Sequence, residues 1–399
     1  MPELSQRVRS TPVATTVAMS IRAREMRAQG LDVIALTIGE PDFPTPRHAI
    51  EAAYQSALRG ETKYPPQDGL PFLKEAVQRK FKRDSGLDYA LDEIMVGNGG
   101  KQVLFDALMA TVDPGDEVIV PAPYWGAYKL MTQVVGGTPV VVNCPQNNGF
   151  KLRPEDLDAA VTPRTKWLIL NYPNNPTGAA ATADELRALA DVLRRHPHVW
   201  VLSDDMYEHL NYDGPTPTMA AVAPELRDRT LTLSGVSKTY AMTGWRIGFA
   251  GGPRVLVKAM VNMQGQATAG VSTVGQAAAA AALDGPQDEA TAMKEAYRRR
   301  RDMVVDALRD APGMAIHTPG GAFYAFPNVA GLLGRTTPGG ATLQTDTDVA
   351  MALLAEAHVA VVPGVAFGMS PYLRISFATG DDALREACGR IAGFCRSLR

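Results

Sequence analysis

Short apolar runs rich in β-branched residues alternate with helical patterns through the middle of this 399-residue chain. Stretches such as 101–112 and 183–195 have the length and spacing of helices between those runs. Strands joined through helices lie parallel, and helices then cover both faces of the sheet. The sequence therefore predicts an α/β fold built on a mostly parallel sheet. The expected strands are Ile94–Val96, Glu117–Val120, Pro139–Val142, Trp167–Leu170, Val199–Ser203, Thr230–Leu233 and Ile247–Ala250.

The pattern changes after about residue 285, where a long helical stretch, Glu289–Leu308, begins. Shorter expected strands follow it at Ala322–Phe326, Val359–Val362 and Tyr372–Phe377. We therefore expect a smaller α+β domain after the larger one. The expected parts are an N-terminal segment (1–30) that packs with the small domain, a large domain (45–285) and a small C-terminal domain (286–399).

The charges of the chain nearly cancel, with 40 Lys+Arg against 42 Asp+Glu. No net field therefore favours nucleic acid or an anionic membrane, and we expect neither as a partner. The densest basic run, Arg298–Arg301, lies inside a helical pattern. We predict that this run is a solvated helix face rather than a nucleic-acid site.

The three cysteines are scattered and lack the spacing of metal ligands, which predicts free thiols and no metal site. The first ten residues are polar and lack the apolar core of a secretion signal. No run approaches the roughly 18 consecutive apolar residues that a membrane span requires. We therefore expect a cytoplasmic protein.

Lys238 follows the expected buried strand Thr230–Leu233, and Arg246 comes eight residues later. A lysine beside a buried strand loses hydration, which disfavours its ammonium form and makes the amine a candidate nucleophile. Arg246 and Ser237 could hold a phosphate close by. A reactive amine with a phosphate clamp suits covalently held pyridoxal phosphate. The alternative is a lysine that extends its charge to solvent beside a structural arginine.

Further polar residues follow other expected strands, and ligands of parallel sheets bind at the carboxyl ends of the strands. Asp204 ends one strand, and its carboxylate could pair with a pyridinium nitrogen. Tyr207 and Asn175, the latter in the loop Asn171–Gly178, could hydrogen-bond to the oxygen of the same ring. An ordinary acidic turn and an ordinary Asn-Pro turn are the alternatives.

Four more residues suggest ligand contacts. Gly100 and Lys101 lie at the start of an expected helix, where backbone amides can approach an anion, although the spacing is not that of a Walker loop. Trp125 could stack on a planar cofactor, although a tryptophan is more often part of the core. Arg374 lies in an apolar strand pattern, and a buried arginine needs an anion, for which a substrate carboxylate is suitable.

Taken together, these segments resemble the class I, fold type I, pyridoxal-phosphate-dependent aminotransferases. The resemblance extends from Gly39-Glu-Pro-Asp-Phe43 to Arg374 and is greatest to the bacterial aspartate aminotransferases of the prokaryotic subgroup. It implies a seven-stranded central sheet, pyridoxal 5′-phosphate as cofactor, amino acids and 2-oxo acids as substrates, and a homodimer with shared active sites. The implied reaction is reversible amino transfer from L-aspartate to 2-oxoglutarate by a ping-pong route.

The resemblance also implies roles for single residues. Lys238 would bond to the cofactor and move the substrate proton, Asp204 would pair with the ring nitrogen, and Lys101 would reach the distal carboxylate, with Thr15 nearby. The implied cofactor-binding residues are Tyr64, from the neighbouring subunit, and Gly100, Lys101, Trp125, Asn175, Asp204, Tyr207, Ser237, Lys238 and Arg246. The implied substrate-binding residues are Thr15, Gly39, Lys101, Trp125, Asn175 and Arg374.

Some positions differ from the family pattern. Gly235 lies where many relatives have a serine, so the hydroxyl contact to phosphate must come from Ser237 or Ser234. Thr11 precedes Pro12, where relatives that also accept prephenate tend to have a basic residue. The alternatives to aspartate transfer are therefore broader specificity, for alanine, aromatic amino acids or prephenate, and β-elimination on the same fold.

Overall fold

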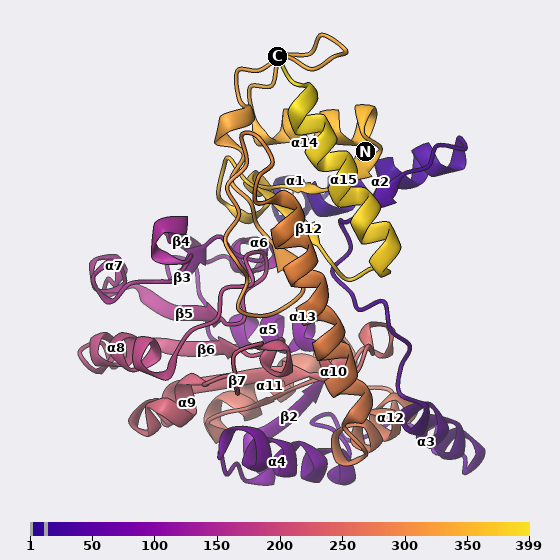
Figure 1. Ribbon diagram of the computed structural model, residues 1–399. Coiled ribbons are helices and arrows are strands. Elements are labelled where there is room, and N and C mark those ends of the chain that lie inside the picture. Colours follow the sequence, from indigo (N-terminus) through magenta and orange to yellow (C-terminus); the bar gives the residue numbers. More distant parts are fainter. Residues whose placement is uncertain (1–2, 12–14) are drawn as a thin grey trace.

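The computed structural model describes residues 3–11 and 15–399, and a seven-stranded sheet forms its centre (Figure 1). The strand order is β2-β8-β7-β6-β5-β3-β4, and all neighbours are parallel except β8, which is antiparallel to β2 and β7. The strands are β2 (Ile94–Gly97), β3 (Glu117–Ala122), β4 (Thr138–Asn143), β5 (Thr165–Asn171), β6 (Trp200–Asp204), β7 (Thr230–Gly235) and β8 (Gly248–Gly251). The predicted fold class and the seven strands are confirmed, with boundaries shifted by at most two residues.

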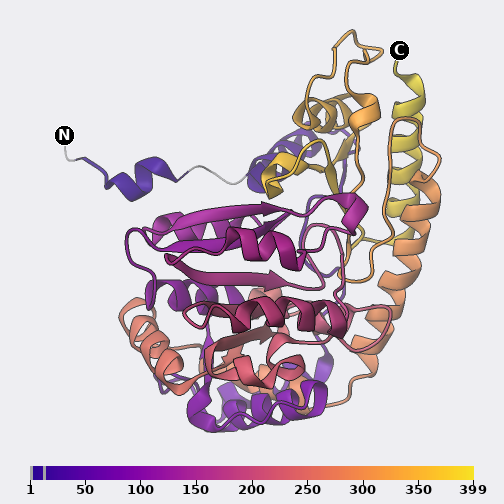
Figure 2. The ribbon, with the colours of Figure 1, turned by 90° about the vertical axis from the view of Figure 1, so that its left-hand side faces the viewer.

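Successive side chains of β5 pack against opposite layers of helices, as the two-residue period of a strand requires. Trp167 and Ile169 lie in the apolar cluster that includes α5 and α11, whereas Leu168 and Leu170 lie in the cluster of α7 and α8. Figure 2 shows the layered arrangement from the side. The helices of this part are α3 (Arg47–Leu58), α4 (Pro71–Ser85), α5 (Gly100–Met109), α6 (Ala127–Val134), α7 (Pro154–Ala160), α8 (Ala183–Arg194), α9 (Met219–Val222), α10 (Val236–Thr239), α11 (Arg254–Ala267) and α12 (Thr273–Asp284).

The C-terminal elements form a second core around a small antiparallel sheet of order β11-β12-β9. They are α13 (Asp288–Leu308), β9 (Tyr324–Ala325), α14 (Asp346–Glu356), β10 (Val359–Ala360), β11 (Val362–Pro363), β12 (Leu373–Ser376) and α15 (Asp381–Ser397). The expected strand Val359–Val362 is two strands, because β10 pairs with β1 (Ile34–Ala35) and β11 pairs with β12. Near the N-terminus lie α1 (Gln6–Ser10) and α2 (Thr15–Ala28), and α2 buries Met19, Ala23 and Met26 in this second core. The division into domains stays a prediction.

The prediction of a solvated face at Arg298–Arg301 is wrong for two of these residues. Arg298 and Arg299 are exposed, but Arg300 is buried and ion-paired to Asp42 and Asp381. Arg301 lies over the ring of Tyr212, 4.9 Å from the ring centroid. The helix turns two of four consecutive arginines toward the protein, where carboxylates and an aromatic face satisfy their charge.

Asp106 on α5 is a buried acid that we expect to make stability depend on pH. Its side chain is 1% exposed, and its Oδ2 has no hydrogen-bond partner among the described residues. Burial raises the pKa of Asp106 to about 7. Between the unfolded pKa, near 4, and this folded value, the folded chain binds more protons than the unfolded chain, so rising pH destabilises the fold.

Asp106→Asn removes this titration and keeps the shape of the side chain. We expect its gain in free energy of unfolding over the parent to be greater at pH 8 than at pH 5.5 by about 1–2 kcal/mol. Urea denaturation at the two pH values measures the gain, with Asp310→Asn at an exposed position as the control. An equal gain at both pH values would show that the buried carboxyl is not the cause.

The structure shows the state of the three cysteines. Cys144, Cys388 and Cys395 are buried free thiols, as predicted. Within residues 3–11 and 15–399, no His, Cys, Asp and Glu side chains gather into a group that could hold a metal ion. No helix of the same ranges has both the length and the apolar character to cross a membrane.

Candidate active site

The carboxyl ends of three neighbouring parallel strands bring the chemically active side chains together. Asn171 at the end of β5 pairs in register with Asp204 at the end of β6. Asp204 in turn lies beside Leu233 of β7, and the chain then enters α10, which carries Lys238. The sheet register therefore places the end-of-strand carboxylate next to the segment that carries the lysine.

Lys238 has the properties of an amine held ready for chemistry. Its Nζ donates a hydrogen bond to the carbonyl oxygen of Gly39 at 2.5 Å. Burial lowers the pKa of Lys238 to about 8, and the positive charges of Arg374 and Arg246 act in the same direction, against the carboxylates of Glu40 and Asp204. A lysine with this pKa has a substantial neutral fraction near pH 8, and the neutral amine is the nucleophilic form.

Asp204 is buried and hydrogen-bonded on both carboxylate oxygens. The hydroxyl of Tyr128 donates to Oδ2 at 2.6 Å, and the amide of Met206 donates to Oδ1 at 3.2 Å. Burial raises the pKa of Asp204 to about 6, although both hydrogen bonds and the charge of Lys238 favour the ionised form. A buried carboxylate in this state is stabilised further by a cationic ring nitrogen.

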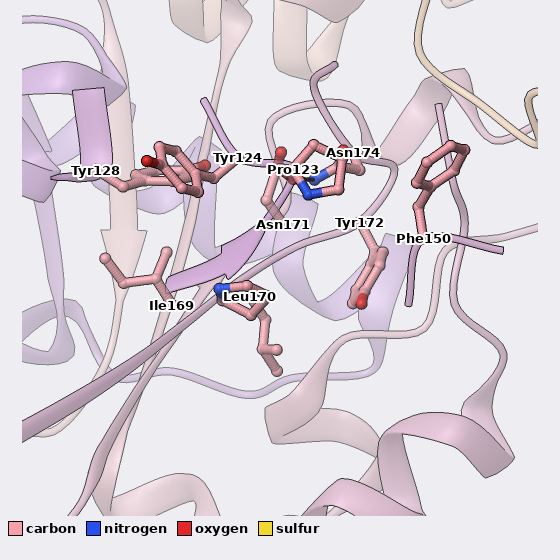
Figure 3. Close-up of a pocket in the computed structure, with 10 residues that line it drawn as sticks. Pro123, Tyr124, Tyr128, Phe150, Ile169, Leu170, Asn171, Tyr172 and Asn174 are labelled. Carbon is pink, nitrogen blue, oxygen red and sulfur yellow. Dashed lines mark hydrogen bonds between the residues drawn. The ribbon is translucent and has the colours of Figure 1, made fainter. Parts of the chain in front are cut away.

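Two residues that hydrogen-bond to Asp204, Tyr128 and Asn171, line a small pocket (Figure 3). Asn171 donates its side-chain amide to the backbone oxygen of Asp204 at 2.9 Å. Tyr124 and Phe150 add aromatic faces to the wall. Tyr128 is not predicted from the sequence, where its position three residues after Trp125 is the only local signal. Its pairing with Asp204 spans 76 residues.

Tyr207 and Tyr324 share a hydrogen bond between their hydroxyl groups at 2.9 Å, and both side chains are buried. The sequence predicts that Tyr207 donates to a ring oxygen of the cofactor, and that role stays a prediction. Tyr324 is a second residue that the sequence analysis missed. A β-carbon at Gly39 would lie 2.9 Å from the Tyr324 hydroxyl, so glycine permits this close approach.

Arg374 is a buried cation without a carboxylate partner among the described residues. Its Nη2 donates to the carbonyl oxygen of Thr37 at 2.6 Å, and its Nη1 donates to the side-chain oxygen of Asn175 at 3.1 Å. Its Nε has no partner in the described part of the chain. The guanidinium lies over the rings of Tyr324 and Phe367, 4.7 and 4.9 Å from their centroids. A buried arginine with an unused donor is suited to bind an external carboxylate.

The start of α5 and the segment before β8 form a close backbone cradle beside Arg246. Gly99 precedes α5 with φ of 83°, and a β-carbon there would collide with the Arg246 guanidinium. A β-carbon at Gly100 would lie 2.5 Å from the terminal methyl of Met206. Arg246 is exposed and donates to the carbonyl of Thr243 at 2.7 Å, which leaves donors for an anion. The helix N-terminus adds its partial positive charge, so the cradle is suited to phosphate.

The two serines near the lysine have different environments. Ser237 is buried in α10, next to Lys238. Ser234, the other candidate for the hydroxyl contact, donates its hydrogen to a carboxylate oxygen of Glu208. Ser237 is therefore the serine that remains available to a phosphate.

The remaining site residues lie at the edge of the site or outside the described part. Lys101 is exposed, with its Nζ 5.0 Å from the ring centroid of the half-buried Trp125, and burial and the charge of Arg246 lower the pKa of Lys101. Tyr64 is 93% exposed and makes no contribution to the site of its own chain. Thr15 begins α2, but its side chain lies outside the described residues.

Comparison with known proteins agrees with this geometry. Residues 31–391 match the family described as aminotransferase class I and II. An aspartate aminotransferase of Rhizobium meliloti is 52% identical over 395 residues, which are 99% of this chain and 96% of that protein. An aspartate/prephenate aminotransferase of Cereibacter sphaeroides is 52% identical over 399 residues, with 100% of both chains covered. A crystal structure of the aspartate aminotransferase from Rhizobium meliloti matches with a TM-score of 0.98 at 52% identity, over 100% of both chains.

The match covers both sequence and structure from end to end. The family region begins before Gly39 and ends beyond Arg374, so it contains the lysine, the end-of-strand carboxylate and the buried arginine. The structural match extends over the central sheet and the C-terminal elements alike. Together with the site geometry, these similarities show that the chain belongs to the aminotransferase class I and II family of enzymes.

Proposed function

We propose that the chain is a pyridoxal-phosphate-dependent aspartate aminotransferase, which reversibly transfers the amino group of L-aspartate to 2-oxoglutarate by a ping-pong route. The observation that carries the proposal is the buried Arg374, whose Nε–H is unused, beside an amine, Lys238, of lowered pKa. An amino-acid substrate brings the carboxylate that this arginine lacks. The names of the relatives support the same reaction.

The side chains and backbone of the site fit pyridoxal phosphate. The cradle at Gly99 and Gly100, which side chains would fill, leaves room for a phosphate near Arg246 and Ser237. The buried acid Asp204 suits the ring nitrogen, because a positive charge there would stabilise its ionised form. The remaining cofactor contacts that we propose are those of Tyr64 from the second subunit, the backbone of Lys101, and the side chains of Trp125, Asn175 and Tyr207. When bound, the cofactor supplies an electron sink that makes the Cα–H bond of an amino acid acidic.

The chain's own residues orient the substrate and move its proton. Arg374 binds the α-carboxylate with its free donor and holds the Cα–H bond in one orientation. Asn175 lies beside Arg374, and Gly39 lies beside Lys238. The Nζ of Lys238 accepts the Cα proton in its neutral form and returns it as the ammonium. The pKa of about 8 keeps both forms accessible near neutral pH. Trp125 and the aromatic rings around Arg374 limit the access of water.

We further propose a cytoplasmic homodimer with shared sites and a division into the three parts expected from the sequence. Tyr64 supports the dimer, because a side chain that is 93% exposed can reach a neighbouring subunit. The burial of Met19, Ala23 and Met26 of α2 in the C-terminal core supports an N-terminal segment that belongs with the small domain.

Lys101 is the residue that we expect to select dicarboxylic substrates, with Thr15 nearby. Lys101→Ala removes a cation at the mouth of the site, so we expect kcat/KM for aspartate and glutamate to fall about 10–100-fold, a loss of roughly 1.5–3 kcal/mol for a charge-assisted hydrogen bond. The activity with alanine should change less than about threefold, because alanine has no distal carboxylate. Equal losses on all three amino acids would contradict the assignment.

A panel of amino donors with 2-oxoglutarate tests the proposed function itself. We expect aspartate to give the highest kcat/KM, with oxaloacetate as product. Release of ammonia and pyruvate from a cysteine conjugate without any 2-oxo acid would support a β-lyase instead. Prephenate is a 2-oxo acid, so it is tested as the acceptor in place of 2-oxoglutarate, with aspartate as the donor, because one relative is named an aspartate/prephenate aminotransferase. Thr11 stands where relatives that accept prephenate tend to have a basic residue. We therefore expect prephenate to be a poorer acceptor than 2-oxoglutarate.

A further inference from the structure

The segment 37–45, which joins β1 to α3, crosses the site with little backbone support of its own. No backbone amide of this segment donates a hydrogen bond to a backbone carbonyl of another described residue. Side chains from other elements hold it instead. Arg374 binds the carbonyl of Thr37, and Lys238 binds the carbonyl of Gly39. The two central side chains of the site therefore depend on where this segment lies.

The strongest ionic contact of the segment is made by Asp42. Arg300 on α13 donates from its Nη1 to both carboxylate oxygens of Asp42, at 2.9 and 3.0 Å, and Tyr297 donates its hydroxyl at 3.2 Å. The guanidinium also lies 5.3 Å from the ring centroid of Phe43. Arg300 is buried, with 8% of its side chain exposed, so water screens this pair less than a surface pair.

A second carboxylate fixes Arg300 from the other side. Its Nε donates to Asp381, at the start of α15, at 2.7 Å. Helix α13 has 21 residues and runs past the sheet to the C-terminal elements in both views (Figures 1 and 2). Arg300 therefore lies on a long helix and is oriented by Asp381 of α15. Its other carboxylate partner, Asp42, lies on segment 37–45.

We propose that Arg300 and Asp42 are positioning residues, which hold segment 37–45 so that its carbonyls stay on Lys238 and Arg374. The proposal rests on the proposed function of those two residues in amino transfer. The planar fork of an arginine can bind two carboxylates in fixed directions, which the single ammonium of a lysine cannot do. The ion pair therefore acts through the backbone of the segment and touches neither substrate nor cofactor.

The test compares two substitutions that each remove one carboxylate from the same arginine. Asp42→Asn releases the segment, whereas Asp381→Asn is the matched control at the α15 side. Thermolysin, which cuts before large apolar residues, can cut before Ile38 once the segment opens. Below the unfolding temperature, we expect Asp42→Asn to be cut there about tenfold faster than the parent, and Asp381→Asn less than about twofold faster.

The kinetic prediction follows from the same geometry. Because Arg374 loses the fixed Thr37 carbonyl, Asp42→Asn should raise KM for the amino donor about tenfold, with a smaller fall in kcat. Arg300→Lys keeps the charge without the fork and should give an intermediate cleavage rate. If Asp42→Asn does not fold, Arg300→Lys serves as the test variant in its place.

The cleavage rate is measured without substrate or cofactor, so the proposal can fail separately from the proposed function. Equal cleavage of Asp42→Asn and Asp381→Asn would overturn the positioning role even in an active aminotransferase. Native cleavage and native KM in Arg300→Lys would also overturn it. Selective cleavage in a protein without aminotransferase activity would leave the ion pair as a support of the segment and would refute the proposed function alone.

Discussion

Replacing Lys238 with alanine should lower kcat by roughly 10²–10⁴-fold, the contribution of a well-placed proton-transfer group. It should also abolish the visible absorbance of lysine-bound cofactor, because no other amine has the same position at the end of β7. The physical basis is the burial that lowers the pKa of Lys238 to about 8 and the hydrogen bond that directs its Nζ to Gly39. Absorbance spectra of the protein mixed with pyridoxal phosphate, together with single-turnover rates, measure both effects.

The matched control is Lys258→Ala, which removes an exposed lysine on α11. We expect its spectrum and its turnover to equal those of the parent. A Lys238→Ala protein that kept both the absorbance and the turnover would show that the assignment of Lys238 is wrong.

Replacing Arg374 with methionine should lower kcat/KM about 30- to 4,000-fold for every amino acid and 2-oxo acid. This corresponds to about 2–5 kcal/mol, the cost of removing one partner of a buried charged pair. All substrates should be affected, because each has the α-carboxylate that the free Nε and the neighbouring donors of Arg374 would bind. Lys101→Ala, by contrast, should affect dicarboxylic substrates alone.

Two further variants separate the effect of the charge of Arg374 from the effect of its geometry. Arg374→Lys keeps the positive charge but loses the fork, so we expect an intermediate kcat/KM. Arg254→Met, at an exposed position on α11, should be indistinguishable from the parent. Because methionine is apolar and of similar length, we expect Arg374→Met to stay folded, which thermal denaturation checks. A native kcat/KM in folded Arg374→Met would exclude Arg374 as the carboxylate site.

The strands of the central sheet could be predicted closely because their signal is local. Apolar runs such as Thr230–Leu233 are buried on both faces in a parallel sheet, and helical patterns separate them. The candidate Asp204 could also be predicted, since it directly follows such a run, and so could the loop of Asn175, which begins at Asn171. Register between neighbouring parallel strands then brought Asn171 and Asp204 together.

The partners of those residues could not be predicted in the same way. Tyr128 and Tyr324 lie 76 and 117 residues from Asp204 and Tyr207, with no local pattern that marks the contacts. The basic run at Arg298–Arg301 was misinterpreted for a related reason. Four adjacent arginines suggest a solvated surface, and only the packing of α13 shows which of them turn inward.

The sequence by itself determined the α/β class, the order of strands and helices, and the residues able to carry amine, carboxylate and phosphate chemistry. These features depend on short-range periodicity and on residue type. Only the tertiary structure decided that Lys238 is desolvated, that Arg374 has an unused donor, and that Arg300 holds segment 37–45 through Asp42. Burial depends on the packing of the whole chain, and so do hydrogen bonds such as that of Arg374 to Thr37, which are 337 residues apart. No local pattern contains this information.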